Sequence, residues 1–257
     1  ILLHAADQGA SPSSLDLGVV GAGRIGSLVA RWAECLGMRV HRNDPPLEAA
    51  GGAGPWLSLD ALLRVSDVVT LHVPFTRAGR FATARLLDSA GIGRLRPAAA
   101  LINTSRGDIV DERALKYALA ANPSIHAFID TWANEPNIDR GLVSRCRIAT
   151  PHIAGHSVEA KQRGSRMIRK SLATWLAGDR RSELNHNGEG NRPGIDGKPL
   201  AGFDPSTLDA AVRGCDLVQM DARLRAALSD GGVGFDAVRS TLGHRYEFGH
   251  VIDGVRE

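Results

Sequence analysis

The sequence contains little cysteine, few aromatic residues and no long apolar run. Its three cysteines, Cys35, Cys146 and Cys215, are too few and too far apart for a disulfide framework or a metal-ligand cluster. We therefore expect no metal site and a reducing, cytoplasmic environment. No stretch approaches the roughly 18 uncharged apolar residues that a membrane span requires, so we expect a soluble protein without a membrane partner. A net charge of +3, with both signs interspersed, is too small to indicate a nucleic-acid partner.

The first part of the chain has the pattern of an α/β domain. Hydrophobic residues make up 43% and charged residues 23% of the sequence, which is typical of a globular protein. Short apolar runs alternate with helical stretches such as 27–36, 111–121 and the basic segment 157–176. The expected strands are 15–20, 38–43, 67–73, 98–103, 125–129 and 147–149. This alternation predicts βαβ units and a doubly wound parallel sheet.

The composition changes after the basic helix. Residues 183–205 contain five glycines, three prolines and three asparagines, which predicts a linker or long loop. Residues 206–257 regain apolar residues at helical spacing, but about fifty residues are too few to bury an independent core comfortably. We expect this tail to pack on the main domain or on a partner subunit.

Gly21, Gly23 and Gly26 form a G-x-G-x-x-G loop between an expected strand and an expected helix. The first glycine permits a tight turn, the second lets a pyrophosphate approach the backbone, and the third lets the helix pack on the strand. Asp44 lies 23 residues after Gly21, where a carboxylate can bind an adenosine ribose and repel a 2′-phosphate. The pattern predicts NAD as the cofactor, with Arg42 leaving NADP as an alternative. The other explanation is a structural glycine turn with a solvated aspartate.

Arg106, Glu135 and His152 each follow an expected strand, so we expect them at the edge where open α/β sheets bind ligands. Such a set suits the oxidation of a 2-hydroxy acid by hydride transfer to a nicotinamide. An arginine binds the substrate carboxylate, a histidine takes the hydroxyl proton, and a neighbouring carboxylate stabilises the imidazolium. Any one residue alone could be a surface ion pair, a helix cap or a backbone-bonded histidine. The three motifs together favour the catalytic interpretation.

Five segments resemble those of the D-isomer-specific 2-hydroxyacid dehydrogenases over roughly residues 1–180. The segments are GVVGAGRIG, LHVP, LINTSRGDIVDERAL, IDTWANEP and TPHIAG, and the spacing of 29 residues from Arg106 to Glu135 is also similar. The resemblance implies a Rossmann-like NAD-binding domain with Arg106, Glu135 and His152 as catalytic residues. It also implies cofactor contacts by Arg24, Ile25, Val73, Asp130 and Gly155, with Asp130 reaching the nicotinamide amide.

Within that family, three segments look like the branch that oxidises 4-phospho-D-erythronate in pyridoxal 5′-phosphate biosynthesis. They are 44–46, 159–164 and the tail around 235–248. This likeness implies a homodimer formed through a small C-terminal α+β dimerisation domain. The family usually has a substrate-contacting tyrosine where this chain has His156, and an imidazole can still bind a phosphate. The alternatives are another D-2-hydroxyacid dehydrogenase, acting on glycerate or 3-phosphoglycerate, and a non-catalytic NAD-binding regulator.

These patterns divide the chain into five expected parts. Residues 1–14 are a remnant of the substrate domain or its connecting helix, 15–155 the NAD-binding domain, 156–182 a helix returning toward the substrate domain, 183–205 a linker and 206–257 the dimerisation domain. The family has about half of its substrate domain before the glycine loop, and this chain begins at Ile1. We therefore expect the sequence to lack the N-terminal part of that domain.

Overall fold

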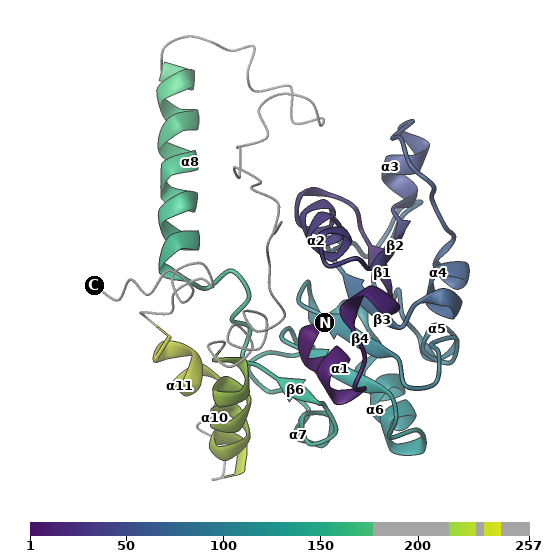
Figure 1. Ribbon diagram of the computed structural model, residues 1–257. Coiled ribbons are helices and arrows are strands. Elements are labelled where there is room, and N and C mark those ends of the chain that lie inside the picture. Colours follow the sequence, from purple (N-terminus) through teal and green to yellow (C-terminus); the bar gives the residue numbers. More distant parts are fainter. Residues whose placement is uncertain (177–215, 230–233, 243–257) are drawn as a thin grey trace.

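The computed structural model describes residues 1–176, 216–229 and 234–242, and its centre is one parallel six-stranded sheet in the order β2-β1-β3-β4-β5-β6 (Figure 1). The strands are β1 (Asp16–Val20), β2 (Arg39–Asn43), β3 (Val68–Leu71), β4 (Ala100–Asn103), β5 (His126–Ile129) and β6 (Ile148–Ala149). All six expected strands are present within slightly shorter bounds. The prediction of a parallel α/β sheet is confirmed.

Helices cover both faces of the sheet and form three layers. On one face, alanines of α1 (Leu2–Asp7) and α2 (Arg24–Cys35) belong to the same buried cluster as Leu17 and Val19 of β1. The helices associated with the second core are α4 (Leu59–Val65), α5 (Ser89–Ile92), α6 (Glu112–Ala121) and α7 (Arg140–Val143); the short α3 (Pro45–Ala49) follows β2. This two-sided burial explains the continuous apolar runs of the central strands β1 and β3.

The strand order places the candidate site. Strand β1 pairs with β2 on one side and with β3 on the other, so the order of the sheet reverses there. Ligands of open α/β sheets bind outside the carboxyl ends of the strands at such a reversal. The glycine loop follows β1, and the segments with Arg106, Glu135 and His152 follow β4, β5 and β6. One edge of the sheet therefore holds all four segments.

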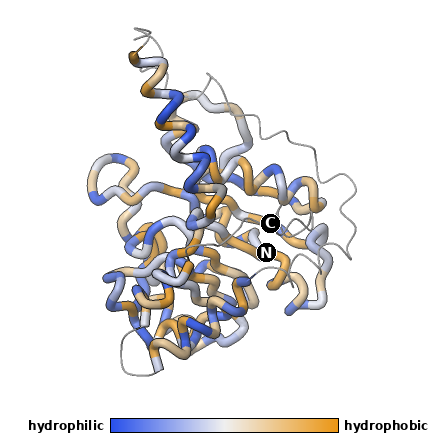
Figure 2. The backbone as a smooth tube through the Cα atoms, turned by 90° about the vertical axis from the view of Figure 1, so that its left-hand side faces the viewer, coloured by the Kyte–Doolittle hydropathy of each residue, from blue (hydrophilic) through white to orange (hydrophobic). Residues whose placement is uncertain are grey.

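The expected basic helix is present as α8 (Val158–Leu176), which projects from the body of the molecule (Figure 1). Hydrophilic and hydrophobic segments alternate along it (Figure 2). Its exposed apolar side chains are Met167, Ile168, Leu172, Trp175 and Leu176. In the part of the chain that the structure describes, no helix is both long and apolar enough to cross a bilayer.

The described part of the C-terminal tail packs beside β6. It consists of α10 (Leu217–Ser229) and α11 (Gly234–Ser240). Asp221 accepts a hydrogen bond of 2.7 Å from the backbone N–H of Ala149, and Arg225 donates to the carbonyls of Val143 and Cys146 at 2.8 Å each. Leu224, Leu228 and Phe235 join the main core. The predicted linker at 183–205 lies outside the described residues, and the dimerisation role of the tail stays a prediction.

Candidate active site

The glycine loop has the backbone that a pyrophosphate site requires. Gly21 has a φ of +89°, and a Cβ there would lie 2.6 Å from the carbonyl oxygen of His72. A Cβ on Gly26 would lie 1.8 Å from the carbonyl oxygen of Gly21, so only glycine lets α2 start this close to the loop. Above Gly23, by contrast, no atom lies within 4 Å of the Cβ position. A bound group can therefore approach the backbone at Gly23.

The start of α2 supplies the positive end of this site. The helix begins at Arg24, three residues earlier than the expected segment 27–36, because Gly23 is extended and serves as its N-cap. No side chain caps it. The free N–H groups and the helix dipole favour an anion at that position. Arg24 and Ile25 are exposed on the first turn, beside the space that a phosphate would occupy.

Asp44 is fixed by two backbone N–H groups. Its Oδ1 accepts from Leu47 at 2.9 Å and caps α3, while its Oδ2 accepts from Ala22 in the glycine loop at 2.8 Å. Each carboxylate oxygen can still accept another hydrogen bond. Arg42 instead forms an ion pair with Glu34 on α2. The residues present thus fit NAD, with a carboxylate held where the ribose is expected.

Val73 and His72 border the glycine loop on the β3 side. A Cβ on Gly21 would lie 2.8 Å from a methyl carbon of Val73, so Val73 adjoins the loop. The imidazole of His72 turns back to the Thr70 hydroxyl at 3.0 Å, and burial lowers the pKa of His72 to about 4. His72 is therefore neutral at physiological pH and adds no charge near the nucleotide site.

Arg106 lies on the loop after β4, where the Asn103 side chain shapes the turn. The Asn103 amide donates to the Arg106 carbonyl at 2.9 Å, and its oxygen accepts from the Ser105 backbone and hydroxyl. The Arg106 guanidinium is exposed and donates to the Ser105 carbonyl at 2.6 Å. Among residues 1–176 and the described parts of the tail, Arg106 has no ion-pair partner. Its remaining N–H groups are available to an anion.

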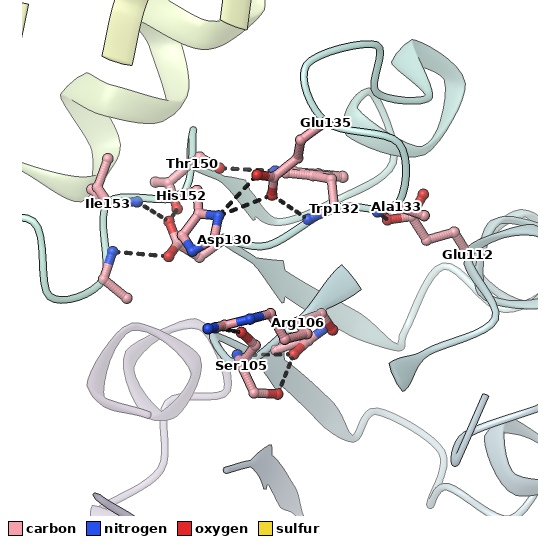
Figure 3. Close-up of polar contacts among 12 residues, drawn as sticks. Ser105, Arg106, Glu112, Asp130, Trp132, Ala133, Glu135, Thr150, His152 and Ile153 are labelled. Carbon is pink, nitrogen blue, oxygen red and sulfur yellow. Dashed lines mark hydrogen bonds and ion pairs between the residues drawn. The ribbon is translucent and has the colours of Figure 1, made fainter. Parts of the chain in front are cut away.

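Glu135 and His152 come together from different loops (Figure 3). Nδ1 of His152 lies 2.9 Å and 3.1 Å from the two carboxylate oxygens of Glu135. An ionised carboxylate only accepts hydrogen bonds, so Nδ1 carries the hydrogen and Nε2 of the neutral ring is left to accept a proton. His152 has a φ of +54°, which a residue with a side chain rarely adopts. Its N–H donates to the Asp130 carbonyl at 2.8 Å.

Asp130 is buried and holds the loop that carries His152. Its Oδ1 accepts from the Thr150 hydroxyl at 2.6 Å and from the Ile153 N–H at 2.8 Å, while its Oδ2 accepts from the Ala154 N–H at 2.9 Å. These contacts are visible beside the His152–Glu135 pair (Figure 3). Asp130 therefore has a positioning role in the structure, and its Oδ2 retains capacity for a further donor such as an amide.

Gly155 and His156 follow on the same loop. Gly155 has a φ of +73°, with nothing within 4 Å of its Cβ position, so it faces open space. The N–H of His156 donates to the Ile153 carbonyl at 2.9 Å, and the half-buried His156 precedes the start of α8. The loop thus places His156 four residues beyond His152.

Sequence reasoning missed Gly107 and Glu112. A Cβ on Gly107 would lie 1.9 Å from the carbonyl carbon of Trp132, so the Arg106 loop touches the backbone of the Glu135 loop. Glu112 accepts a hydrogen bond of 2.7 Å from the N–H of Ala133 in that second loop. Both residues lie inside the motif that contains Arg106. A glycine directly after the arginine was the only sequence signal for this contact.

Relatives of known name match the whole chain. The erythronate-4-phosphate dehydrogenase of Pseudomonas putida (strain W619) is 36% identical over 260 residues, which cover 99% of this chain and 67% of the relative. The enzyme of that name from Pseudomonas aeruginosa (strain ATCC 15692) is 36% identical over 269 residues, covering 100% of this chain and 68% of the relative.

Solved structures match about two thirds of the chain. The D-lactate dehydrogenase from Aquifex aeolicus, crystallised with NAD and lactic acid, is 30% identical with a TM-score of 0.54 and covers 66% of this chain and 55% of that one. The TT0316 protein from Thermus thermophilus is 35% identical with a TM-score of 0.54, covering 66% and 53%. The chain spans about two thirds of the named relatives and about half of these structures.

A family model matches residues 4–154, which is more than half of the chain, and its description is "D-isomer specific 2-hydroxyacid dehydrogenase, NAD binding domain". This range contains the glycine loop, Asp44 and the three residues expected to be catalytic. The cofactor of this domain is NAD, as the sequence predicted. The chain therefore belongs to the D-isomer-specific 2-hydroxyacid dehydrogenases.

Proposed function

We propose that this protein is an NAD-dependent dehydrogenase that oxidises 4-phospho-D-erythronate at C2, giving 2-oxo-3-hydroxy-4-phosphobutanoate. The observation that carries this proposal is the His152–Glu135 pair, which lies at the same sheet edge as the exposed cation of Arg106 and the glycine loop. The names of the relatives that match the whole chain support the substrate.

Arg106 binds the substrate carboxylate in this proposal. A guanidinium can donate two parallel hydrogen bonds to a carboxylate, which fixes the acid in one orientation. The Ser105 carbonyl engages one nitrogen of the Arg106 side chain and leaves the others to donate. An anchored carboxylate brings the neighbouring C2 hydroxyl toward the histidine.

His152 acts as the general base. Its Nε2 takes the proton of the C2 hydroxyl as the C2–H bond breaks and the carbonyl double bond forms. NAD⁺, when bound, supplies the acceptor for the hydrogen and the electron pair that leave C2. Glu135 keeps the Nδ1 hydrogen in place and stabilises the imidazolium that results. In the reverse direction the imidazolium returns the proton to the oxygen.

The phosphate requires a second site. A phosphomonoester carries about −1.5 to −2 charges at neutral pH, and one arginine cannot bind both ends of the substrate. We assign the phosphate to His156, Lys161 and Arg163, which lie on the loop after His152 and on the first turns of α8.

We further propose a cytoplasmic homodimer formed through residues 206–257, with no nucleic-acid or membrane partner. The small net charge and the scarce cysteines support the location and the lack of a nucleic-acid partner. The apolar periodicity of the tail supports the assembly. A native-mass measurement should give twice the chain mass, and a monomer would contradict this assembly.

The substrate is tested by a panel of four acids with NAD⁺: 4-phosphoerythronate, 3-phosphoglycerate, glycerate and lactate. We expect the highest kcat/KM for 4-phosphoerythronate. His152→Ala should lower kcat by about 10²–10⁴ and leave NADH binding nearly unchanged. A preference for glycerate or lactate would contradict the substrate. Absence of turnover on all four acids by a chain that carries the complete substrate domain, with NADH still bound, would instead favour the NAD-binding regulator.

A further inference from the structure

We infer that Glu112 is a positioning residue that fixes the Glu135 loop against the Arg106 loop and thereby orients His152. Glu112 is the first residue of α6, and its Oε1 accepts a hydrogen bond of 2.7 Å from the N–H of Ala133 (Figure 3). The consequence for turnover rests on the proposed function. The structural claim stands on the contacts alone.

The hydrogen bonds continue from Ala133 to the base. The N–H of Trp132, the residue before Ala133, donates to Oε1 of Glu135 at 2.8 Å. Both oxygens of Glu135 then face Nδ1 of His152. The orientation of the Glu135 carboxylate therefore depends on the backbone of residues 132–133. Glu112 holds this backbone from the opposite side, at the start of α6.

The contact between the two loops is close. Gly107, which follows Arg106, leaves no room for a side chain against the backbone of Trp132 and Ala133. Glu112 lies five residues further along the same segment and adds a hydrogen bond across the contact. The separation between the Arg106 cation and the acid–base pair is thus set by this contact and not by either loop alone.

The surroundings of Glu112 are acidic and partly buried. Burial raises the pKa of Glu112 to about 7, with further increases from the charges of Asp139, Asp108 and Glu135; the hydrogen bond from Ala133 opposes the rise. A protonated carboxyl group still accepts through its carbonyl oxygen. The positioning contact therefore needs an acceptor at this reach and does not need the negative charge.

Three variants separate the hydrogen-bond acceptor at position 112 from its negative charge. Glu112→Gln keeps an acceptor of the same reach without the charge. Glu112→Asp keeps a carboxyl group but is one methylene too short to maintain the contact. Glu112→Ala removes both. The matched control is Asp88→Ala, which removes a 2.8 Å carboxylate bond to the Gly91 N–H at the start of α5, outside both loops.

The readout is the tautomer of His152 in the full chain, measured from ring ¹⁵N shifts after assignment with His152→Gln. Wild type, Glu112→Gln and the Asp88→Ala control should all keep the hydrogen on Nδ1. Glu112→Asp and Glu112→Ala should lower the ratio of the Nδ1–H to the Nε2–H form by about tenfold, the low end of the effect expected when the hydrogen bond from Nδ1–H to the charged Glu135 carboxylate is lost. Glu112→Asp keeps an acidic residue at the helix start and serves if the alanine variant does not fold.

An unchanged tautomer in folded Glu112→Asp or Glu112→Ala would overturn the inference, and so would a Glu112→Gln variant that behaves like Glu112→Ala. Turnover of the acid panel is measured separately. A tautomer shift in a chain whose wild type oxidises none of the acids supports the positioning role and contradicts the proposed function. An unchanged tautomer in the folded Glu112→Asp or Glu112→Ala variant, in a chain whose wild type oxidises 4-phosphoerythronate, contradicts the positioning role and supports the proposed function.

Discussion

Asp44 joins the cofactor site to the stability of the fold, so its substitution has two measurable effects. In Asp44→Ala, the N-cap of α3 is lost, which costs about 1 kcal/mol. The N–H of Ala22, a residue only 5% exposed, also loses its carboxylate partner, at a cost of about 1–3 kcal/mol. We expect a total loss of about 2–4 kcal/mol in the free energy of unfolding.

The second effect concerns the cofactor. A hydrogen bond to a charged group contributes about 1.5–3 kcal/mol, so Asp44→Ala should weaken NADH binding by about 10- to 150-fold. NADPH binding should not weaken to the same extent, because the carboxylate that repels a 2′-phosphate is gone. The ratio of the two dissociation constants should therefore approach one.

Calorimetric titration with NADH and NADPH measures the ratio, and thermal unfolding measures the stability. A loss of about 3 kcal/mol corresponds to about 6–12 °C in Tm for a chain of this size. Ser58→Ala is the control, because Ser58 caps α4 through Ala61 and has no bond to the glycine loop. It should lose about 1 kcal/mol and keep its cofactor preference. An unchanged NADH/NADPH ratio in Asp44→Ala would refute the role of Asp44, and an unchanged Tm would refute the hydrogen-bond argument.

Three further perturbations test other parts of the structure. Burial holds the pKa of His72 at about 4, against 6.5 for the ordinary group, so the unfolded chain binds a proton first as the pH falls. Unfolding free energy should therefore drop by about 2–3 kcal/mol between pH 6.5 and pH 4, and His72→Gln should flatten this dependence in urea titrations. Gly107→Ala places a methyl group against Trp132; we expect a loss of about 1–3 kcal/mol and a lower kcat/KM, and wild-type values would contradict the loop contact. Asp221→Ala frees the N–H of Ala149 on the edge strand, so amide exchange there should accelerate, and unchanged exchange would show that α10 does not protect this edge.

The strands and the glycine loop could be predicted because their signals are local. Each buried strand is a short apolar run, and Gly21 and Gly26 of the G-x-G-x-x-G loop each meet a nearby constraint, such as the 1.8 Å approach of the Gly26 Cβ position to Gly21. The short helices were not predicted. Helices α3, α4, α5 and α7 have only 4–7 residues, too few for an apolar period. Their common signal is a single aspartate or serine cap, which the sequence contains at many other positions.

The first turn of α2 shows a different limit. The expected helix at 27–36 began after the glycine loop, because glycine and a following arginine gave no apolar pattern. In the structure the helix begins inside the motif, at Arg24, with Gly23 as its N-cap. A helix start defined by free N–H groups, rather than by side chains, leaves little trace in the sequence. The motif itself was the better guide to its position.

The candidate site illustrates why the residues of a site are easier to predict than the hydrogen bonds that their side chains form. Arg106, Glu135 and His152 could be selected because each follows a strand of the same parallel sheet, and parallel strands end at one edge. Sequence spacing, however, gives no direction for a side chain. For Asp130, which the resemblance places near the nicotinamide amide, the structure adds three hydrogen bonds that fold the loop after β6 back over the end of β5.

That fold-back explains the backbone of the histidine. The Asp130 carbonyl accepts from the N–H of His152, and the Asp130 carboxylate accepts from the N–H groups of Ile153 and Ala154. Bonds to three consecutive N–H groups hold His152 at its φ of +54°, a conformation that costs about 1–3 kcal/mol in a residue other than glycine. The same conformation brings Nδ1 to within 2.9 Å of Glu135. The His152–Glu135 pair therefore depends on the buried carboxylate of Asp130, on the neighbouring strand. A substitution of Asp130 should impair the function of His152 as a base although the His152 side chain itself is unchanged.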